Sequence, residues 1–245
     1  MFSELKDKVA IVTGGASGIG AETVKRLASL GVRVISADMN DELNKENAET
    51  FKGQGLDVTP IYNDVRSIDS IKEVVAYTKK NFNRIDILVN NAGIGERKSY
   101  DKTNIEEWDR VIETNLRSVM FYCLEVLPVM KNQKQGRIIN VSSMAAKIGG
   151  FHSGTDYVAS KAGIIGVTMN LAKQVGSYGI NVNGIAPGVI HTPMTASYPN
   201  DITETIPLRR KGTPEDIADS ILFLASGLSS YITGITLDVN GGLHM

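Results

Sequence analysis

The first forty residues read as a strand, a glycine-rich turn, a helix and a second strand, and this order constrains the fold more than any other feature. The apolar run Val9 to Val12 leads into Thr13-Gly14-Gly15-Ala16-Ser17-Gly18-Ile19-Gly20, and an amphipathic stretch follows as far as Leu30-Gly31. The second strand ends just before Asp38, eighteen residues past Gly20. This order predicts a nucleotide-binding βαβ unit of the Rossmann type.

The glycine-rich turn has the composition of a phosphate-binding site. It would place backbone N–H groups and the positive end of a helix dipole beside a pyrophosphate, which glycines allow to approach closely. Its spacing, Gly-x-x-x-Gly-x-Gly from Gly14 to Gly18 to Gly20, differs from the usual dinucleotide fingerprint. Asp38 stands where a carboxylate would bond the ribose hydroxyls of adenosine. The alternative, a turn followed by an unrelated acidic loop residue, explains the full order less well.

Strand-like and helix-like segments alternate along the rest of the chain, which indicates a parallel sheet with helices on both faces. No Pro/Ser-rich linker, low-complexity tract or repeat divides the 245 residues. We therefore expect one α/β domain, residues 1–245, doubly wound, with a seven-stranded parallel sheet that carries both the cofactor and the substrate sites. The predicted strands lie near Val9 to Thr13, Val32 to Ala37, Val58 to Tyr62, Ile87 to Asn90, Arg137 to Ser142, Asn181 to Ala186 and Ile235 to Val239.

Composition excludes several classes of function. The formal net charge of −1 offers no basic field for nucleic acid. No apolar run approaches the length of a membrane span, and the charged N-terminus lacks the apolar core of a secretion signal, so we predict a cytoplasmic protein that does not bind membranes. The only cysteine, Cys123, lies in an apolar helical segment and is expected to be buried and inert. His152, His191 and His244 lack ligand spacing, so no metal site is predicted.

Tyr157 and Lys161 lie four residues apart in a predicted helix, so their side chains share one face. A tyrosine hydroxyl has a pKa near ~10, and a cation held close lowers it toward the range in which it exchanges protons at neutral pH. The pair therefore predicts a general acid/base. The alternative interpretation is a half-buried tyrosine beside a solvated lysine.

Six motifs in order along almost the whole chain resemble those of the short-chain dehydrogenase/reductase family. They are Thr13 to Gly20, Asn90-Asn91-Ala92-Gly93, Asn115, Ser143 after Asn140-Val141-Ser142, Tyr157 with Lys161, and Pro187-Gly188 with Thr192. The resemblance implies a Rossmann-type oxidoreductase that transfers a hydride between a nicotinamide cofactor and a carbon bearing oxygen. Its catalytic residues would be Asn115, Ser143, Tyr157 and Lys161.

The resemblance also assigns roles. Tyr157 would exchange a proton with the substrate oxygen, Lys161 would favour the phenolate and bond the nicotinamide ribose, and Ser143 would polarise the substrate oxygen. Asn115 would support a water that links Lys161 to solvent. Ser142 competes with Ser143, but strand alternation turns the two side chains opposite ways, and the match to the family favours Ser143. Fourteen residues separate Ser143 from Tyr157, one more than in many relatives, so we expect the intervening loop to bulge.

The same resemblance implies the residues that bind the cofactor: Gly14, Ser17, Gly18, Ile19, Gly20, Asp38, Asp64, Val65, Asn91, Ala92, Gly93, Tyr157, Lys161, Pro187, Gly188, Ile190 and Thr192. Among these, Asp38 indicates NAD (NADH), because a carboxylate there would repel the 2′-phosphate of NADP. Ser17 stands where relatives that use NADP often carry a basic residue, and Met39 supplies no cation either. Asp64 and Val65 would meet the adenine.

The substrate side is predicted to be mostly apolar, which suits a neutral ketone or secondary alcohol. The expected wall residues are Ile94, Met144, Phe151, His152, Ile190, Met194 and Tyr198. Arg97 and Lys98, beside Glu96, could anchor a substrate carboxylate, but a solvated loop is the preferred interpretation. The segment Trp108 to Met130 and the Tyr157 helix are apolar on two sides, which favours a partner subunit, and the family resemblance points to a homotetramer.

Three functions remain in competition. The first is an NAD-dependent dehydrogenase or reductase of small-molecule alcohols and ketones. The second is 3-oxoacyl-carrier-protein reduction in fatty-acid synthesis; such reductases generally use NADP and often carry a basic residue for the acidic carrier where this chain has Tyr178. The third, a non-catalytic nucleotide-sensing protein, would not need Ser143, Tyr157 and Lys161 together.

Overall fold

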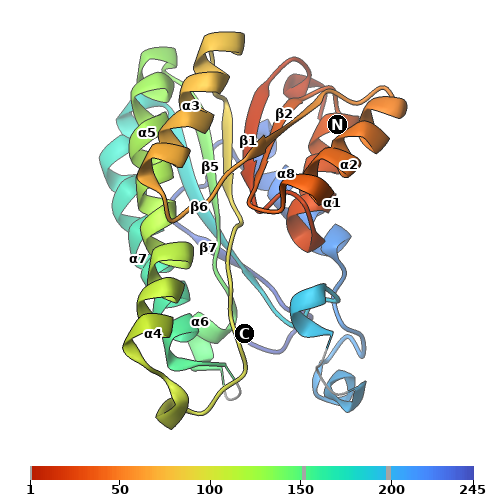
Figure 1. Ribbon diagram of the computed structural model, residues 1–245, viewed down its shortest axis with the longest axis vertical. Helices are drawn as coiled ribbons and strands as arrows, with labels where there is room; N and C mark the ends of the chain where they lie inside the picture. Colours follow the sequence, from red (N-terminus) through yellow and green to blue (C-terminus); the bar gives the residue numbers. More distant parts are fainter. Residues whose placement is uncertain (1, 151–152, 197–199) are drawn as a thin grey trace.

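A computed structural model describes residues 2–150, 153–196 and 200–245, which build one parallel sheet between two layers of helices (Figure 1). The strand order is β3-β2-β1-β4-β5-β6-β7, and every neighbouring pair is parallel. The strands are β1 Val9–Thr13, β2 Arg33–Asp38, β3 Val58–Tyr62, β4 Ile87–Asn90, β5 Gly136–Val141, β6 Ile180–Pro187 and β7 Thr236–Val239. The predicted doubly wound sheet is confirmed, and each strand end lies within one residue of its predicted position.

Helices α3, α5 and α7 cover one face of the sheet, and α1, α2 and α8 lie on the other (Figure 1). The helices are α1 Gly18–Ser29, α2 Asp41–Gly53, α3 Ile68–Phe82, α4 Ile105–Ile112, α5 Ser118–Gln133, α6 Ala145–Ile148, α7 Thr155–Val175 and α8 Pro214–Ala225. Short 3₁₀ turns lie at Ser3–Leu5, Tyr100–Lys102, Gly176–Tyr178, Pro193–Thr195, Asn200–Thr205 and Gly227–Ser229.

Because helices cover both faces, the strands are apolar at nearly every position rather than at alternate ones. In β1, Ile11 packs into the core under α3, α5 and α7, whereas Ala10 and Val12 pack into the core under α1 and α8. All five residues of β1 are buried. Buried strands of this kind leave only their carboxyl ends and the loops that follow free to form a site.

The strand order reverses between β1 and β4, where the chain leaves the sheet in opposite directions. A crevice forms at such a point in doubly wound sheets, outside the carboxyl ends of the strands. The glycine-rich turn follows β1, and the Asn-Asn-Ala-Gly segment lies at the end of β4. The fold therefore brings these two motifs together.

The predicted helix from Trp108 to Met130 is part of a longer helical stretch that is interrupted in its middle. Between α4 and α5, residues Glu113–Arg117 form a π-helical turn, and this turn carries Asn115. Such turns widen a helix by one residue and are frequent at functional sites. Sequence periodicity predicted the helix but not this change of pitch.

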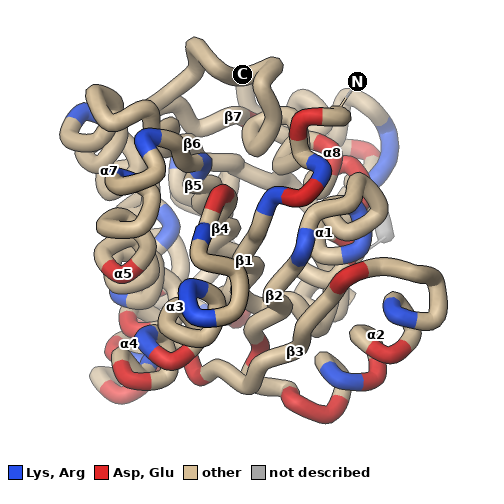
Figure 2. The backbone as a smooth tube through the Cα atoms, turned by 90° about the horizontal axis from the view of Figure 1, so that it is seen from above, with Lys and Arg blue, Asp and Glu red and all other residues tan. Residues whose placement is uncertain are grey.

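Cys123 is fully buried in α5, and burial raises the pKa of its thiol to about 12. The expectation of a buried, unreactive thiol therefore agrees with its surroundings. Lys and Arg are interspersed with Asp and Glu along the described backbone (Figure 2). Within the described residues, no helix combines the length and the hydropathy that a bilayer span requires.

Candidate active site

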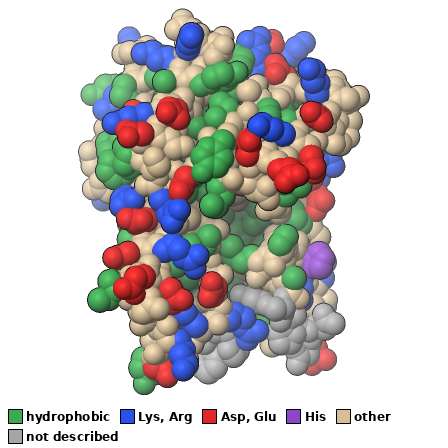
Figure 3. Space-filling model, viewed as in Figure 1, with side chains coloured by type: hydrophobic (Ala, Val, Ile, Leu, Met, Phe, Trp, Pro, Cys, Tyr) green, Lys and Arg blue, Asp and Glu red, His purple; other side chains and the backbone are tan. Residues whose placement is uncertain are grey.

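A cavity of about 1110 Å³ opens at the carboxyl ends of the strands. Figure 3 shows a hollow in this face, with hydrophobic side chains inside it. Most of the residues predicted for the site line the cavity: Gly14, Ser17, Gly18, Ile19, Asp38, Asp64, Val65, Asn91, Ala92, Gly93, Ser143, Tyr157, Lys161, Pro187, Gly188, Ile190 and Thr192. Gly20 and Asn115 lie behind this lining.

The glycine-rich turn needs its glycines for two different reasons. Gly14 and Gly18 have positive φ angles of 65° and 53°, a conformation that side chains disfavour. Gly20 is required by packing instead, since a Cβ atom there would lie 1.9 Å from the carbonyl oxygen of Gly14. The turn therefore leads directly into α1, whose first residue, Gly18, lines the cavity. This is the geometry of a helix N-terminus prepared for an anion.

Thr13 joins the ends of β1 and β4, a role that the sequence analysis missed. Its Oγ1 accepts hydrogen bonds of 3.0 Å from the backbone N–H groups of Asn91 and Ala92. In return, the Asn91 amide donates to the carbonyl oxygens of Thr13 and Gly14, at 3.0 Å each. Two loops that are 77 residues apart in the chain are thus fastened together under the cavity. The sequence signal for this role was a threonine at the last position of the strand.

The Asp38 carboxylate, at the end of β2, is already part of a hydrogen-bond network. Its Oδ2 accepts from Ala16 N at 3.0 Å, and its Oδ1 accepts from Asn40 N at 2.8 Å. Asn47, on α2, donates to Ala16 O at 2.8 Å. Asn47, which was not predicted from the sequence, thus binds the carbonyl oxygen of Ala16, while Asp38 binds its N–H.

Asp64 is paired with a cation that the sequence analysis also missed. Arg66 binds both carboxylate oxygens, with Nε 3.1 Å from Oδ1 and Nη2 2.8 Å from Oδ2. These hydrogen bonds from Arg66 hold the pKa of Asp64 below its usual value. Arg66 itself lines the cavity. The spacing of two residues between the acid and the base was a signal in the sequence.

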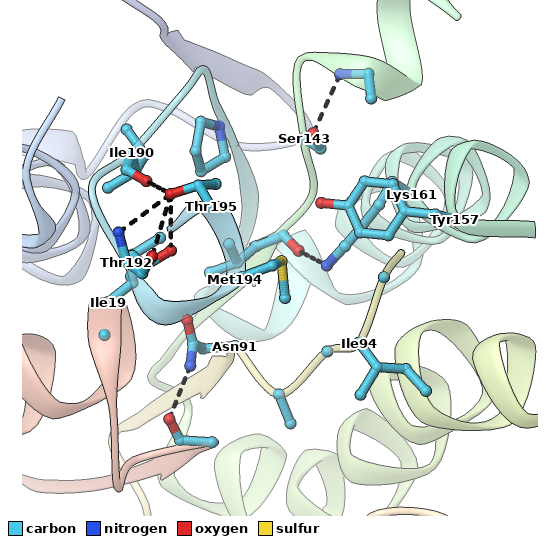
Figure 4. Close-up of a pocket in the computed structure, with 18 of the residues that line it drawn as sticks. Ile19, Asn91, Ile94, Ser143, Tyr157, Lys161, Ile190, Thr192, Met194 and Thr195 are labelled. Atoms are coloured by element: carbon cyan, nitrogen blue, oxygen red, sulfur yellow. Dashed lines mark hydrogen bonds between the residues drawn. The ribbon is translucent and has the colours of Figure 1, made fainter. Parts of the chain in front are cut away.

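Tyr157 and Lys161 project from α7 into the cavity (Figure 4). The Lys161 side chain is buried, with its residue 4% exposed, and its Nζ donates to Val141 O at 2.8 Å. Burial lowers the pKa of Lys161 to about 8. Its Nζ lies 5.8 Å from the centre of the Tyr157 ring, so the cation and the phenol share one environment. The interpretation of Lys161 as a solvated lysine is therefore wrong.

Ser142 and Ser143 point in different directions, as strand alternation predicted. Ser142 is buried, and its hydroxyl donates to Lys161 O at 2.7 Å. Ser143 is only partly buried, and its Oγ accepts from Ala145 N at 3.1 Å. This bond leaves the hydroxyl proton of Ser143 to be donated elsewhere. Ser142 thus supports the backbone of Lys161, while Ser143 presents a donor at the cavity.

Asn115 is fully buried and holds the main chain of the loop after β4. Its Oδ1 accepts from Ile94 N at 2.8 Å, and its Nδ2 donates to Ile94 O at 2.8 Å and to Ser160 Oγ at 3.0 Å. It also lies close to Lys161, because a Cβ on Gly93 would be 3.4 Å from Asn115 Oδ1 and 3.2 Å from Lys161 Nζ. A part in a water-linked proton path stays a prediction for this residue.

Gly95, in the same loop, lines the cavity and was not predicted as a site residue, whereas Lys98, weighed as an anchor for a substrate carboxylate, does not line it. A Cβ on Gly95 would lie 2.5 Å from Cδ2 of Tyr157, so the backbone here packs directly against the phenol ring. The preferred interpretation of Lys98 as a solvated residue is wrong. Its side chain is 10% exposed and forms ion pairs with Asp156 at 2.7 Å and Glu107 at 2.9 Å.

The cavity lining beyond the predicted cofactor residues combines apolar side chains with the charged residues Glu96, Arg97 and Arg110. Of the predicted wall residues, Ile94, Met144, Ile190 and Met194 line it, and Ile148, Ile202 and Leu243 join them without having been predicted. Phe151, His152 and Tyr198 lie outside the described residues. The connection from Ser143 to Tyr157 contains the single turn α6, which ends at Gly149 with φ 82°. Among the described residues, no group of His, Cys, Asp or Glu side chains is arranged to hold a metal ion.

The chain is similar to known reductases over nearly its whole length. A family model described as enoyl-(acyl carrier protein) reductase matches residues 14–244. The 3-oxoacyl-[acyl-carrier-protein] reductase FabG of Thermotoga maritima is 44% identical over 247 residues, covering 98% of each chain. That of Chlamydia trachomatis is 43% identical over 248 residues, covering 99% of this chain and 100% of its own.

Among solved structures, the protein described as gox2181 superposes with a TM-score of 0.94 at 32% identity, with 98% of both chains covered. The chain belongs to the short-chain dehydrogenase/reductase family, oxidoreductases that act on CH–OH and C=O groups with a nicotinamide cofactor.

Proposed function

We propose that this protein is an NAD(H)-dependent dehydrogenase or reductase of small-molecule secondary alcohols and ketones, with Tyr157 as its acid/base. The observation that carries the proposal is the position of Asp38, a carboxylate at the end of β2 that lines the cavity beside the glycine-rich turn. We further propose that one domain, residues 1–245, holds both the cofactor and the substrate.

The residues of the cavity fit a dinucleotide. The N-terminus of α1 and the turn from Gly14 to Gly20 would bind the pyrophosphate. The turn needs glycine at Gly14 and Gly20, because a Cβ at either position would obstruct it. Asp38 would accept the adenosine ribose hydroxyls, and Asp64 and Val65 would border the adenine. Asn91 to Gly93 would lie along the ribose, and Pro187, Gly188, Ile190 and Thr192 would enclose the nicotinamide. When bound, the cofactor supplies or accepts the hydride.

The charges around Asp38 support NAD rather than NADP. A 2′-phosphate would approach the Asp38 carboxylate, and the first turn of α2 adds Asp41 and Glu42 nearby in sequence. Lys45 is paired with Asp41 at 2.6 Å, and Arg66 is paired with Asp64, so both cations are already committed to carboxylates. The Asp38 carboxylate would disfavour the phosphate by repulsion and by lost hydrogen bonds, and these two cations are already held in ion pairs.

The catalytic roles follow from the positions of three side chains. Tyr157 Oη would give its proton to the substrate oxygen during reduction and take it back during oxidation. Lys161, buried beside the ring, would stabilise the phenolate by its charge. Ser143 would donate its free hydroxyl proton to the same substrate oxygen, where negative charge develops. Asn115, behind the cavity lining, would contribute by holding the main chain of Ile94 in place.

The apolar residues of the cavity wall support a neutral substrate, such as a ketone with alkyl substituents.

A second candidate function is 3-oxoacyl-carrier-protein reduction, and the names of the FabG relatives favour it. Two surface features favour the small molecule. Tyr178, at the position where carrier-dependent relatives often have a base, is 44% exposed and uncharged, and the nearby Lys131 ammonium is stacked on its ring at 4.7 Å. On the exposed helix α4 beside the cavity, Glu107 is paired with Lys98, whereas Glu106 and Asp109 add negative charge that would repel an acidic carrier.

We also propose a homotetramer. Leu124 on α5 and Met169 on α7 are 45% and 48% exposed, although both helices already pack on the sheet with their other sides. Apolar side chains on an outer face of a helix favour contact with a second subunit. Light scattering of the purified protein would measure the mass, and a monomer of 26.5 kDa would contradict this part of the proposal.

The test of the function combines a cofactor comparison with one substitution. Ethyl acetoacetate, a neutral 3-oxo ester, serves as the probe ketone, and oxidation of NADH or NADPH is followed by absorbance. We expect kcat/KM with NADH to exceed that with NADPH by at least about tenfold, which corresponds to ~1.4 kcal/mol. Tyr157→Phe should still bind NADH, as seen by fluorescence, while kcat falls by about a hundredfold or more. Equal use of both cofactors, or a Tyr157→Phe enzyme with undiminished turnover, contradicts the proposal.

A further inference from the structure

The loop after β4 is fastened across the first turn of α7 by a series of polar contacts. Asn115 holds both polar groups of the Ile94 main chain. Two residues on, Glu96 O accepts from Gly154 N at 3.1 Å. Two residues further, Lys98 Nζ lies 2.7 Å from Asp156 Oδ2. Between these contacts, Gly95 packs on the ring of Tyr157. The segment Ile94 to Lys98 therefore forms one wall of the pocket around the phenol.

The ion pair at the end of this segment is buried. The side chain of Asp156 is 1% exposed and that of Lys98 is 10% exposed, while Glu107, which also contacts Lys98, is 36% exposed. Burial alone lowers the pKa of Lys98, but its hydrogen bonds to the Asp156 and Glu107 carboxylates and their negative charges together outweigh this effect and raise the pKa above its usual value. Lys98 thus stays charged and connects the loop, α4 and α7.

Asp156 links this pair directly to Tyr157. Its Oδ1 accepts from the backbone N–H of Tyr157 at 2.7 Å, so one carboxylate holds both the Lys98 cation and the start of the tyrosine's own main chain. Gly154 makes this packing possible. A Cβ there would lie 2.4 Å from Asp156 Oδ1 and 2.9 Å from Lys98 Cε, so the lysine stem lies directly across the glycine.

We propose that Lys98, through its ion pair with Asp156, is a positioning residue that holds the Tyr157 ring in its catalytic orientation. The inference rests on the proposed function of Tyr157 as acid/base. The pair closes the segment Ile94 to Lys98 over α7, and Gly95 then limits where the ring can lie. If Lys98 is lost, the Asp156 carboxylate remains buried without its closest cation, and such a group is relieved by local opening toward water. The segment would then separate from α7 and release the ring.

The double substitution distinguishes this role from a general contribution to stability. Lys98→Met keeps an unbranched stem but removes the charge, and it leaves Asp156 unpaired. In Lys98→Met with Asp156→Asn, the carboxylate is replaced by an amide whose oxygen can still accept from Tyr157 N. Lys102→Met, an exposed lysine of the same connection, is the matched control. Ethyl acetoacetate is the probe ketone, and NADH binding and thermal unfolding are measured for every variant.

For Lys98→Met we expect kcat to fall by at least about tenfold, with the dissociation constant of NADH within about twofold of the parent. The dissociation constant is expected to hold because the residues proposed for the pyrophosphate and the adenosine lie outside the segment Ile94 to Lys98. In the double variant, kcat should recover by at least about threefold, and in Lys102→Met it should not change. An unchanged kcat in Lys98→Met overturns the inference. So does a double variant no faster than the single one.

If Lys98→Met does not fold, Lys98→Gln takes its place, since it also removes the charge and leaves Asp156 unpaired, and a kcat within twofold of the parent overturns the inference. Tyr157→Phe is assayed in the same series. A Tyr157→Phe enzyme that keeps its turnover contradicts the proposed function itself. An inactive Tyr157→Phe beside a fully active Lys98→Met contradicts only the positioning role.

Discussion

Asp38 Oδ2 accepts a hydrogen bond from the backbone N–H of Ala16 at 3.0 Å, so the proposed ribose-binding carboxylate also shapes the glycine-rich turn. Cofactor choice and turn geometry are therefore coupled through one side chain. A substitution that removes the charge alone has a different consequence from one that removes the oxygen atoms as well.

The coupling predicts different outcomes for Asp38→Asn and Asp38→Ser. Both remove the charge, so the preference for NADH over NADPH in kcat/KM should fall by about tenfold in each, or ~1.4 kcal/mol. Asn keeps one oxygen acceptor for Ala16 or Asn40, whereas Ser is too short to reach both. Asp38→Ser should therefore also lose kcat/KM with both cofactors relative to Asp38→Asn. Glu49→Gln, an exposed change on α2, is the control and should leave the ratio unaltered.

Lys161 is predicted to cost the free protein stability, because burial lowers its pKa from 10.5 to about 8. A difference of this size corresponds to roughly 3 kcal/mol between the charged and the neutral form. The unfolded chain binds this proton more tightly, so the cost is fully present below about pH 8 and disappears as pH rises past the unfolded value of 10.5. Lys161→Met should therefore stabilise the cofactor-free protein at pH 7, and about half of this gain should be lost by pH 9.5.

Urea unfolding at the two pH values measures this effect. Lys173→Met, an exposed lysine on the same helix, serves as the control and should change the free energy of unfolding by less than about 1 kcal/mol at both. A destabilised Lys161→Met protein at pH 7 would mean that the bond to Val141 O outweighs the desolvation of the charge. Activity should be lost in Lys161→Met at either pH.

Thr13 is predicted to be as important for the cavity as the glycines beside it. Thr13→Val keeps the shape of the side chain but leaves the N–H groups of Asn91 and Ala92 without their acceptor. Each unpaired donor costs about 1–3 kcal/mol where water does not reach it, so the free energy of unfolding should fall by up to ~2–6 kcal/mol in total, and NADH binding should weaken. Thr13→Ser keeps the hydroxyl and should retain most of both. A Thr13→Ser protein that loses as much as Thr13→Val would contradict the assignment of the effect to the hydroxyl alone.

Much of the fold was predictable because both faces of the sheet are buried, and a run such as Val9 to Val12 is then apolar throughout. The motifs that follow the strands were predictable as site residues for the same reason, since parallel strands present their carboxyl ends on one edge. The pairing of Lys98 with Asp156 was not predictable. The two residues lie on separate elements, and only the packing of the loop on α7 makes them neighbours.

Local spacing also misled at Lys98, where Glu96 and Arg97 suggested a solvated charged loop. The same three residues diverge in the structure: Glu96 contacts Arg110 at 3.4 Å, whereas Lys98 turns inward under the loop. The π-helical turn around Asn115 was equally invisible, because one extra residue per turn leaves the apolar periodicity of the flanking helices intact.

Ionic strength separates the small-molecule enzyme from a carrier-protein reductase. Recognition of an acidic carrier by surface charge should weaken steeply as salt rises through about 0.1 M, where the screening length is near ~10 Å. The turnover of neutral ethyl acetoacetate should barely respond to salt.

With the acidic face of α4 beside the cavity and the uncharged Tyr178, we expect kcat/KM for a 3-oxoacyl-carrier-protein substrate to be no greater than that for the free ester, at low and at high salt. Steady-state kinetics of both substrates at 0.02 and 0.3 M salt, roughly on either side of that screening regime, would measure this. A strong preference for the carrier that fades with salt would instead place a basic docking patch around Lys131, Lys134 and Arg137, and the carrier-dependent function would replace the one proposed.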